Sequence, residues 1–177
     1  MPKVGCGKKI ATVDELTGTT MTEGAWDGQE TFPPKGVTRL QPGTYCISGD
    51  VIIDGGTALT GDGVLLIIED GEFLVRGNAK ISLSAPGNGA GKGLLIYMPI
   101  ENKGRVALNG NKESGFRGTI LAPGSKIRII GNESRYGYHS QIIGYTIELD
   151  GNSKIIVRYM NDQNYDAQIM PEIQLIQ

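Results

Sequence analysis

The chain of 177 residues contains few of the side chains on which catalysis and ligand binding most often depend. It has one histidine, two cysteines and only 6% aromatic residues. No run of about 18 apolar residues occurs, so we expect no transmembrane helix in this chain. The 17 basic and 19 acidic residues are interspersed and give a net charge of −2, which argues against a nucleic-acid surface.

The two cysteines, Cys6 and Cys46, both lie in the N-terminal quarter of the chain. No cluster of His, Cys and Asp near them offers a metal site, so we predict that they form a disulfide. Closing a loop of about 40 residues would stabilise the fold by roughly 3–4 kcal/mol on the chain-entropy model. Two unrelated buried thiols are the alternative. No apolar leader follows Met1, which leaves open both a removed leader or anchor and a cytosolic chain.

Glycine is the abundant residue, with 27 copies in the chain, where an average share of about 7% would give roughly half as many. The glycines follow no G-X-Y period and stand singly or in pairs between short apolar runs, which is typical of turns in an all-β chain. Hydrophobic residues make up 39% of the chain and charged residues 20%, which indicates one globular domain.

A short apolar run that ends in a Gly-Asn or Gly-Gly pair recurs along the chain. Its copies are Val51–Gly56, Phe73–Asn78, Val106–Asn111, Ile127–Asn132 and Ile147–Asn152. The steps between the first glycines of successive pairs are similar, except for one long step between the second copy and the third. The long step contains a loop insertion at Ser84–Gly91. Without the insertion, the spacing fits a repeat of roughly 22 residues.

A second set of strands runs in phase between these copies, at Val64–Ile68, Leu94–Met98, Thr119–Ala122 and Gln141–Gly144. Weaker third strands follow some of the turns, at Ala79–Leu83 and Ser153–Val157. Strand units that recur at a fixed spacing indicate a solenoid, in which each repeat buries its apolar face against its neighbours. We therefore predict an all-β fold, a single-stranded right-handed parallel β-helix with rungs of roughly 20–22 residues.

The recurring glycine pair has a mechanical explanation, because Gly and Asn tolerate the left-handed backbone geometry of a sharp turn. Rungs stacked about 4.8 Å apart would let equivalent asparagines bond amide to amide along the axis. The predicted turn and ladder residues are Gly77, Asn78, Gly110, Asn111, Gly131, Asn132, Gly151 and Asn152. Hairpin turns in a β-sandwich are the alternative, although hairpins favour the order Asn-Gly.

We predict one domain in three parts. Residues 1–38 form an irregular N-terminal capping segment, in which Trp26 and Phe32 cover one open end of the solenoid. Residues 39–160 form the β-helix, and residues 161–177 form a tail that packs along it.

Several separate blocks carry a resemblance to a known family. They are Leu40–Cys46, Gly93–Pro99, Gly118–Pro123, Ser140–Tyr145 and Asn164–Asp166. Over about residues 38–177 the chain resembles the C-terminal region of TadG-like proteins, which are envelope proteins of the tight-adherence pilus-assembly type. The resemblance implies an exported domain. It also implies an N-terminal membrane helix, which this chain lacks.

A β-helical polysaccharide lyase or hydrolase would need carboxylates that converge on one face. The acids Asp54, Asp62, Glu69, Asp70 and Glu72 crowd one region of the sequence. Most of them stand beside glycine in predicted turns, so we interpret them as solvated turn residues. A weak Ca²⁺ site built from Asp62, Asp70 and main-chain carbonyls is the alternative.

The other residues and motifs that could belong to a catalytic or binding site are interpreted mainly as structural. His139 has no Cys nucleophile beside it, and we interpret it as a surface or turn residue. Gly87–Gly93 resembles a phosphate loop but lacks the Gly-Lys-Ser/Thr ending and opens no helix, so we assign it to the insertion. The late tyrosines form either cross-strand packing or a glycan-binding strip. They are Tyr136, Tyr138, Tyr145 and Tyr159.

These patterns together predict a non-catalytic structural or surface protein, a self-assembling subunit of a pilus-like or other envelope appendage. A glycan-binding or adhesive module is the first alternative, and a β-helical polysaccharide lyase or hydrolase is the second. The expected partners are further copies of the chain, other envelope proteins or a surface glycan. We expect no cofactor and no metal, and an extracellular or cell-surface location.

Overall fold

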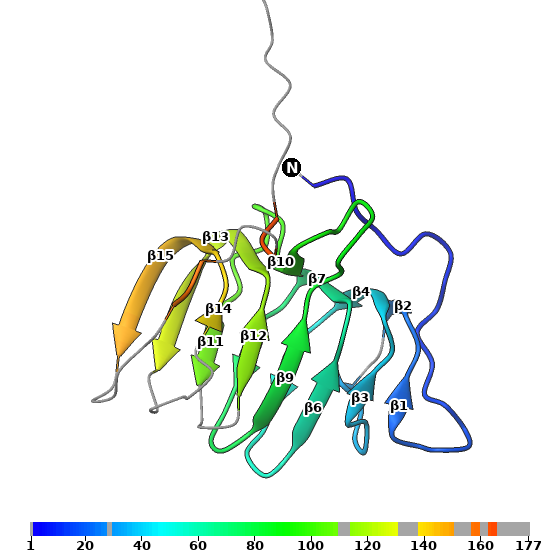
Figure 1. Cartoon of the computed structure of the whole chain (residues 1–177). Helices are drawn as coiled ribbons and strands as arrows, with labels where there is room; N and C mark the ends of the chain where they lie inside the picture. Colours follow the sequence, from blue (N-terminus) through cyan, green and yellow to red (C-terminus); the bar gives the residue numbers. More distant parts are fainter. Residues whose placement is uncertain are drawn as a thin grey trace, which may run out of the picture.

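The computed structural model describes residues 2–27, 30–109, 114–130, 138–150, 157–159 and 163–165. Within these residues the chain forms fifteen β-strands and no helix. The named strands pair in parallel, and successive turns of the chain lie side by side as the rungs of a β-solenoid (Figure 1). The predicted all-β parallel β-helix is therefore confirmed.

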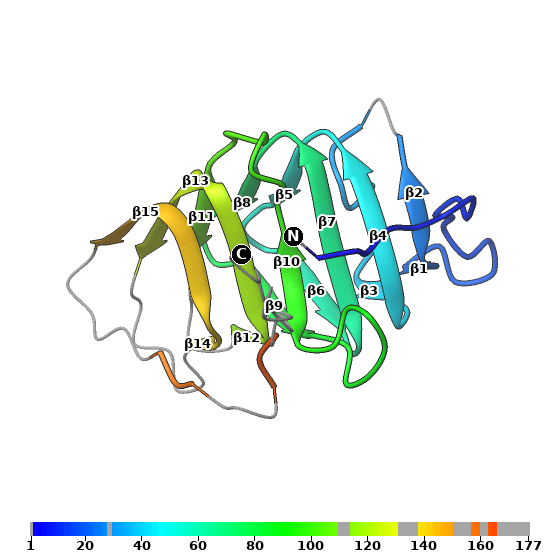
Figure 2. The same cartoon turned by 90° about the horizontal axis from the view of Figure 1, so that it is seen from above.

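The first face of the solenoid, called face 1, is turned toward the viewer in Figure 2. It contains β2 (Gly24–Trp26), β4 (Gly43–Ser48), β7 (Val64–Asp70), β10 (Leu94–Tyr97) and the first parts of β13 (Thr119–Ile130) and β15 (Ile142–Asp150). β4 and β7 each end at a two-residue corner that contains glycine, Gly49-Asp50 and Gly71-Glu72. β13 and β15 instead run on around the corner, so they join face 1 to the next face as one sheet.

Face 2 follows the first corner of each rung. It contains β5 (Val51–Ile53), β8 (Phe73–Val75), β11 (Val106–Asn109) and the second parts of β13 and β15. Face 3 is a separate six-stranded sheet that is turned toward the viewer in Figure 1. It contains β1 (Thr20–Met21), β3 (Arg39–Leu40), β6 (Ala58–Gly61), β9 (Lys80–Ser84), β12 (Gly115–Arg117) and β14 (Tyr138–His139).

The register of face 2 reproduces the spacing of the glycine pairs in the sequence. Val51 pairs with Phe73, Phe73 with Val106, Val106 with Ile127 and Ile127 with Ile147. Each of these partners opens one copy of the recurring run, so the steps between them equal the steps between the glycine pairs, the long one included. The spacing of the recurring turn therefore predicted the spacing of the rungs correctly.

The extra length of the long rung divides between two corners. Most of the extra residues lie before face 1, in the segment between β9 and β10. The step from Leu66 of β7 to its register partner Ile96 of β10 already includes them. The predicted insertion lies in this segment. The rest lies between Tyr97 and Val106, because the step from Phe73 to Val106 is longer than the step from Leu66 to Ile96.

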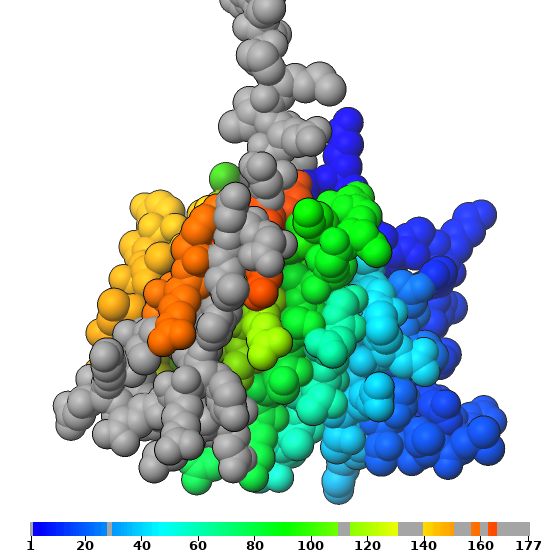
Figure 3. Space-filling model, viewed as in Figure 1, coloured from blue at the N-terminus to red at the C-terminus, as the bar shows by residue number. Residues whose placement is uncertain are grey.

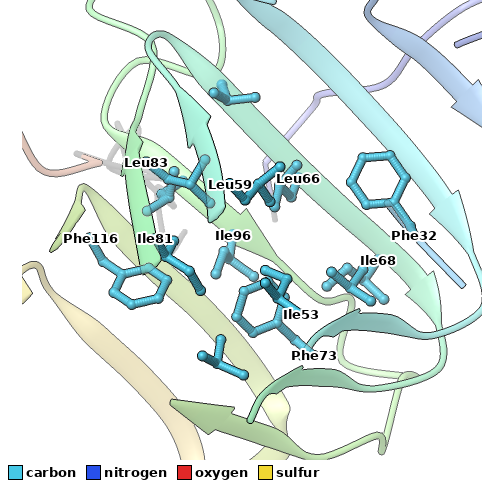
Figure 4. Packing of buried hydrophobic residues seen from close by; sticks show 14 of the residues in the cluster. Phe32, Ile53, Leu59, Leu66, Ile68, Phe73, Ile81, Leu83, Ile96 and Phe116 are labelled. Atoms are coloured by element: carbon cyan, nitrogen blue, oxygen red, sulfur yellow. The ribbon is translucent and has the colours of Figure 1, made fainter. Parts of the chain in front are cut away.

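The core consists of columns of apolar side chains that run along the solenoid axis. Alternate residues of each strand point inward, because successive side chains of a strand lie on opposite faces. The register stacks each inward side chain on its equivalent in the next rung. Figure 4 shows side chains from all three faces meeting in this interior, among them Phe73, Ile96 and Phe116.

Aromatic residues and the first part of the chain close the N-terminal end of the solenoid. Phe32 is fully buried between Trp26 and Tyr45, with ring centroids 6.3 and 5.8 Å away. Ile10 bridges to Ala25 of β2 in parallel, and Val13 bridges to Met21 of β1 in antiparallel orientation. These contacts agree with a cap, although the parallel pairing already begins at β1 and β2, before residue 39.

Candidate functional site: the open end of the solenoid

The two ends of the solenoid differ most in the exposure of their core columns, which become accessible to solvent at β15. One column passes through Phe73, Val106 and Ile127, which are all fully buried. It then reaches Ile147, whose exposed fraction is 46%. A position that is core in every earlier rung is therefore open to solvent in β15.

A second column behaves in the same way. Val75, Leu108 and Ile129 are at most 2% exposed, whereas Leu149, the register partner of Ile129, is 65% exposed. Tyr145, at the corner of the same strand, is 78% exposed. Large apolar side chains grouped on one edge mark an interaction surface more often than single exposed residues do.

The backbone of β15 adds to this surface. Among the described residues, β15 pairs with β13 and with no strand on its other side. A nine-residue edge offers a row of donors and acceptors to an incoming strand, and natural edges are usually blunted by Lys, Pro or shortness. β15 contains neither Lys nor Pro.

Charge does not oppose association at this end. On the outer side of face 2, Lys126 lies 2.6 Å from Glu148, and Arg128 forms an ion pair with Asp150. Both acids of β15 are therefore neutralised by bases of β13. The open end consequently combines an apolar inner row with a balanced outer row.

From the sequence alone, Ile147 and Leu149 are recognisable only as members of the last repeat. The signal that would have identified them is their position, because the final copy of a solenoid repeat needs something other than a further copy to cover it. The repeat alone does not say whether the chain, a partner or solvent does so.

The acidic residues near β7 do not converge, and the suggested Ca²⁺ site at Asp62 and Asp70 is wrong. The two acids lie at opposite ends of the seven-residue strand β7, more than roughly 20 Å apart at about 3.3 Å per residue. Asp62 accepts a hydrogen bond from the Ser84 hydroxyl, and Asp70 accepts one from the Gly49 amide at 2.7 Å. Among the described residues, no group of three or more His, Cys, Asp or Glu could hold a metal.

Other acids of this region join one rung to the next. The carboxylate of Glu72 accepts two hydrogen bonds from the Arg105 guanidinium, at 2.8 and 3.0 Å. These bonds hold the pKa of the Glu72 carboxyl below its usual value. Asp54 lies 3.7 Å from Arg76. The described geometry thus assigns these carboxylates to contacts between rungs.

An apolar row on the outside of face 1 is covered by the ends of the chain. Cys46, Ile67, Tyr97 and Leu121 are successive register partners in this row. The predicted disulfide is confirmed, because Cys6 is bonded to Cys46, with 5.9 Å between their Cα atoms. Residues from both terminal segments, Val4, Cys6 and Tyr165, pack against the row.

Polar contacts tie the same terminal segments to the solenoid. Glu23 forms an ion pair with Lys9 and accepts a hydrogen bond from the Thr44 amide at 3.1 Å. The bond from Lys9, followed by that from Thr44, lowers the pKa of the Glu23 carboxyl. The side chain of Asn164 is buried and accepts a hydrogen bond from the Gln141 amide at 3.1 Å.

The turn residues are described only in part. Gly56 and Gly77 have positive φ angles of 84° and 57°, and Gly77 lies over Gly55 of the preceding rung. Asn78 occupies the same turn. The amide ladder stays a prediction, because its other members lie outside the described residues. They are Gly110, Asn111, Gly131, Asn132, Gly151 and Asn152.

His139 lies in β14, where it pairs in register with Arg117. Tyr136 lies outside the described residues, whereas Tyr145 and Tyr159 are exposed. The Gly87–Gly91 part of the insertion lines an open groove of about 560 Å³ together with Lys3, Glu23 and Thr44.

Comparison with protein-family models, curated proteins and solved structures finds no match for this chain. Among the described residues there is no helix of the length and hydrophobicity needed to cross a membrane.

Proposed function

We propose that this chain is a non-catalytic structural subunit of the extracytoplasmic surface, and that it associates with further copies through the open end of its β-helix. The observation that supports the proposal is the emergence of two core columns at Ile147 and Leu149. Burying a large aliphatic side chain contributes about 1.5–3 kcal/mol. The open end presents both of these side chains. It also presents a strand edge that is unpaired among the described residues, and the combination favours association.

Two observations support an extracytoplasmic location. The Cys6–Cys46 disulfide favours an oxidising compartment, because cytosolic thiols are kept reduced. The resemblance of residues 38–177 to TadG-like proteins implies export and a role in an envelope appendage. On this proposal the partners are copies of the chain or other proteins of the envelope.

Light scattering over about a hundredfold range of protein concentration tests the association. We expect the wild type to form oligomers as its concentration rises. Leu149→Lys should weaken the association by more than about tenfold, because an inward-pointing lysine blocks an edge strand. Leu16→Lys is the matched control, since Leu16 is 97% exposed and lies near the opposite, capped end. A monomeric wild type, or equal weakening by both variants, would contradict the proposal.

A glycan-binding module is a second candidate, which the exposed rings of Tyr145 and Tyr159 favour. Aromatic faces are the usual platform for sugar rings, and the open groove has none among its lining residues. A glycan array distinguishes the candidates. Binding that Tyr145→Ala abolishes in a monomeric protein would favour the glycan module over the structural subunit.

A further inference from the structure

We infer that two copies associate tail to tail, with β15 of one copy antiparallel to β15 of the other across a two-fold axis. This inference rests on the proposed function, because it names the partner and the geometry at the open end. The two solenoids would then share one continuous core, with a closed N-terminal cap at each far end. In the single chain, the N-terminal residues (blue) and β15 (yellow-orange) lie at opposite ends of the molecule (Figure 3).

The N-terminal end cannot receive β15 without displacement of its own chain. β2, the outermost strand of face 1, is covered by the segment that contains Ile10 and Ala11. The Ala11 amide donates to the Ala25 carbonyl at 2.9 Å, and the Ala25 amide donates to the Lys9 carbonyl at 2.8 Å. Since the edge of β2 is occupied, head-to-tail stacking finds no free strand edge on face 1 among the residues described at this end.

The inward and outward positions of β15 follow from its register with β13. Ile142, Gly144, Ile147 and Leu149 pair with Ile120, Ala122, Ile127 and Ile129, which are all buried core residues. Ile143, Thr146 and Glu148 pair with Leu121, Lys126 and Arg128, which lie on the outside. The alternation changes phase at the corner, where β13 has an irregularity between Ala122 and Lys126.

This phase change makes the pattern of β15 self-complementary. Antiparallel pairing centred between Tyr145 and Thr146 places Ile142 opposite Leu149 of the second copy, and Gly144 opposite Ile147. Inward residues then meet only inward residues, and the outward Glu148 lies opposite Ile143. No like charges face one another, which would destabilise a cross-strand pair.

The same register is compatible with backbone pairing along β15 and with the corner that β15 forms between face 1 and face 2. An antiparallel partner of equal length can pair the edge of β15 along both faces, since the two-fold axis passes through the corner that joins them. Position 144 has to be glycine in this strand, because a Cβ there would lie 2.7 Å from the Ile127 side chain of the preceding rung. Tyr145 lies beside the axis, where its exposed ring meets the second copy.

Distances between spin labels in the whole chain test the geometry. The native cysteines are bonded to each other, so a single added cysteine can be labelled selectively. Arg117→Cys places a label near the C-terminal end, on β12, and Leu16→Cys places one near the N-terminal end. Both positions are exposed and lie outside β15.

Tail-to-tail dimers predict a short distance between the two Arg117→Cys labels. The distance between the two Leu16→Cys labels should be longer by about twice the separation of β1 and β12, or roughly 40 Å for strands about 4.8 Å apart. Head-to-tail association would make the two distances nearly equal, because both labels then move by the same translation. That result would overturn the tail-to-tail inference and leave the proposed association intact. Monomeric wild type by light scattering, with no dipolar signal from either label, would overturn both.

Discussion

Ile129 and Leu149 are register partners in one core column, yet the exposed fraction is 1% for Ile129 and 65% for Leu149. The side chains are isomeric, and both point toward the axis of the solenoid. The difference arises because β15 lies over Ile129, whereas no described strand pairs with the far edge of β15.

This relationship predicts unequal effects of the same truncation. Ile129→Ala should lower the free energy of unfolding by about 2–5 kcal/mol, because it leaves a cavity in a packed column. Leu149→Ala should lower it by less than about 1 kcal/mol in dilute protein, because little buried surface is lost. Urea denaturation at low protein concentration measures both. Equal losses would show that β15 is covered in the monomer.

Asn102 stabilises the corner between Tyr97 and Val106. This corner holds the smaller part of the extra residues in the long rung. Its amide donates to the Ile68 carbonyl at 3.0 Å, and its side-chain oxygen accepts a bond from the Gly104 amide at 2.7 Å. The side chain is buried, so Asn102→Ala would leave two main-chain groups without these partners. We expect a loss of about 2–4 kcal/mol in the free energy of unfolding, from about 1–3 kcal/mol for each unpaired buried group.

Asn102→Asp provides the matched variant for this corner. It keeps the shape and the acceptor for Gly104 but removes the donor to Ile68 and introduces a buried charge. We expect Asn102→Asp to destabilise the protein at neutral pH at least as much as Asn102→Ala does. A neutral effect of both variants would contradict the role assigned to this side chain.

The disulfide should stabilise the protein mainly by lowering the conformational entropy of the unfolded chain. The bridge spans a sequence separation of 40 residues, and such a loop predicts a loss of roughly 3–4 kcal/mol on removal. Thermal and urea unfolding of the double variant Cys6→Ala, Cys46→Ala measures the loss. A reducing agent should destabilise the wild type by a similar amount and leave the double variant unchanged. A wild type insensitive to reduction would refute this contribution.

Glu72 should make stability depend on pH in the acidic range. Its pKa is lowered from 4.5 in the folded protein by the bonds from Arg105, so folding favours the charged form. The stabilisation is present above the unfolded pKa and is lost as the pH falls through the lowered pKa. The stability difference between wild type and Glu72→Gln should therefore shrink below about pH 4.5. The effect should be small and sensitive to salt, because both side chains are partly exposed.

Much of the fold followed from the spacing of one turn. A solenoid must turn once at the same place in each rung, so the steps between Gly55, Gly77 and Gly110 equal the steps between Val51, Phe73 and Val106. The disulfide was predictable for a different reason, because the chain has only two cysteines and no metal cluster beside them.

Features that depend on contacts between distant residues were not predictable. Asn102 bonds to Ile68, in the preceding rung, and no local pattern marks that pair. Asp62 and Asp70 are close in sequence, but an extended strand separates them. The first strands were missed because β1 and β2 have only two and three residues and carry no glycine pair like the later turns.

Hydrogen exchange of the β15 amides tests most directly whether the open end is an interaction surface. Amides of β15 that point away from β13 should exchange fast in dilute protein, because no described strand pairs with that edge. At high protein concentration the same amides should become protected, while those of the capped strand β2 remain unchanged. Equal exchange of the β15 amides at both concentrations would contradict association through this end.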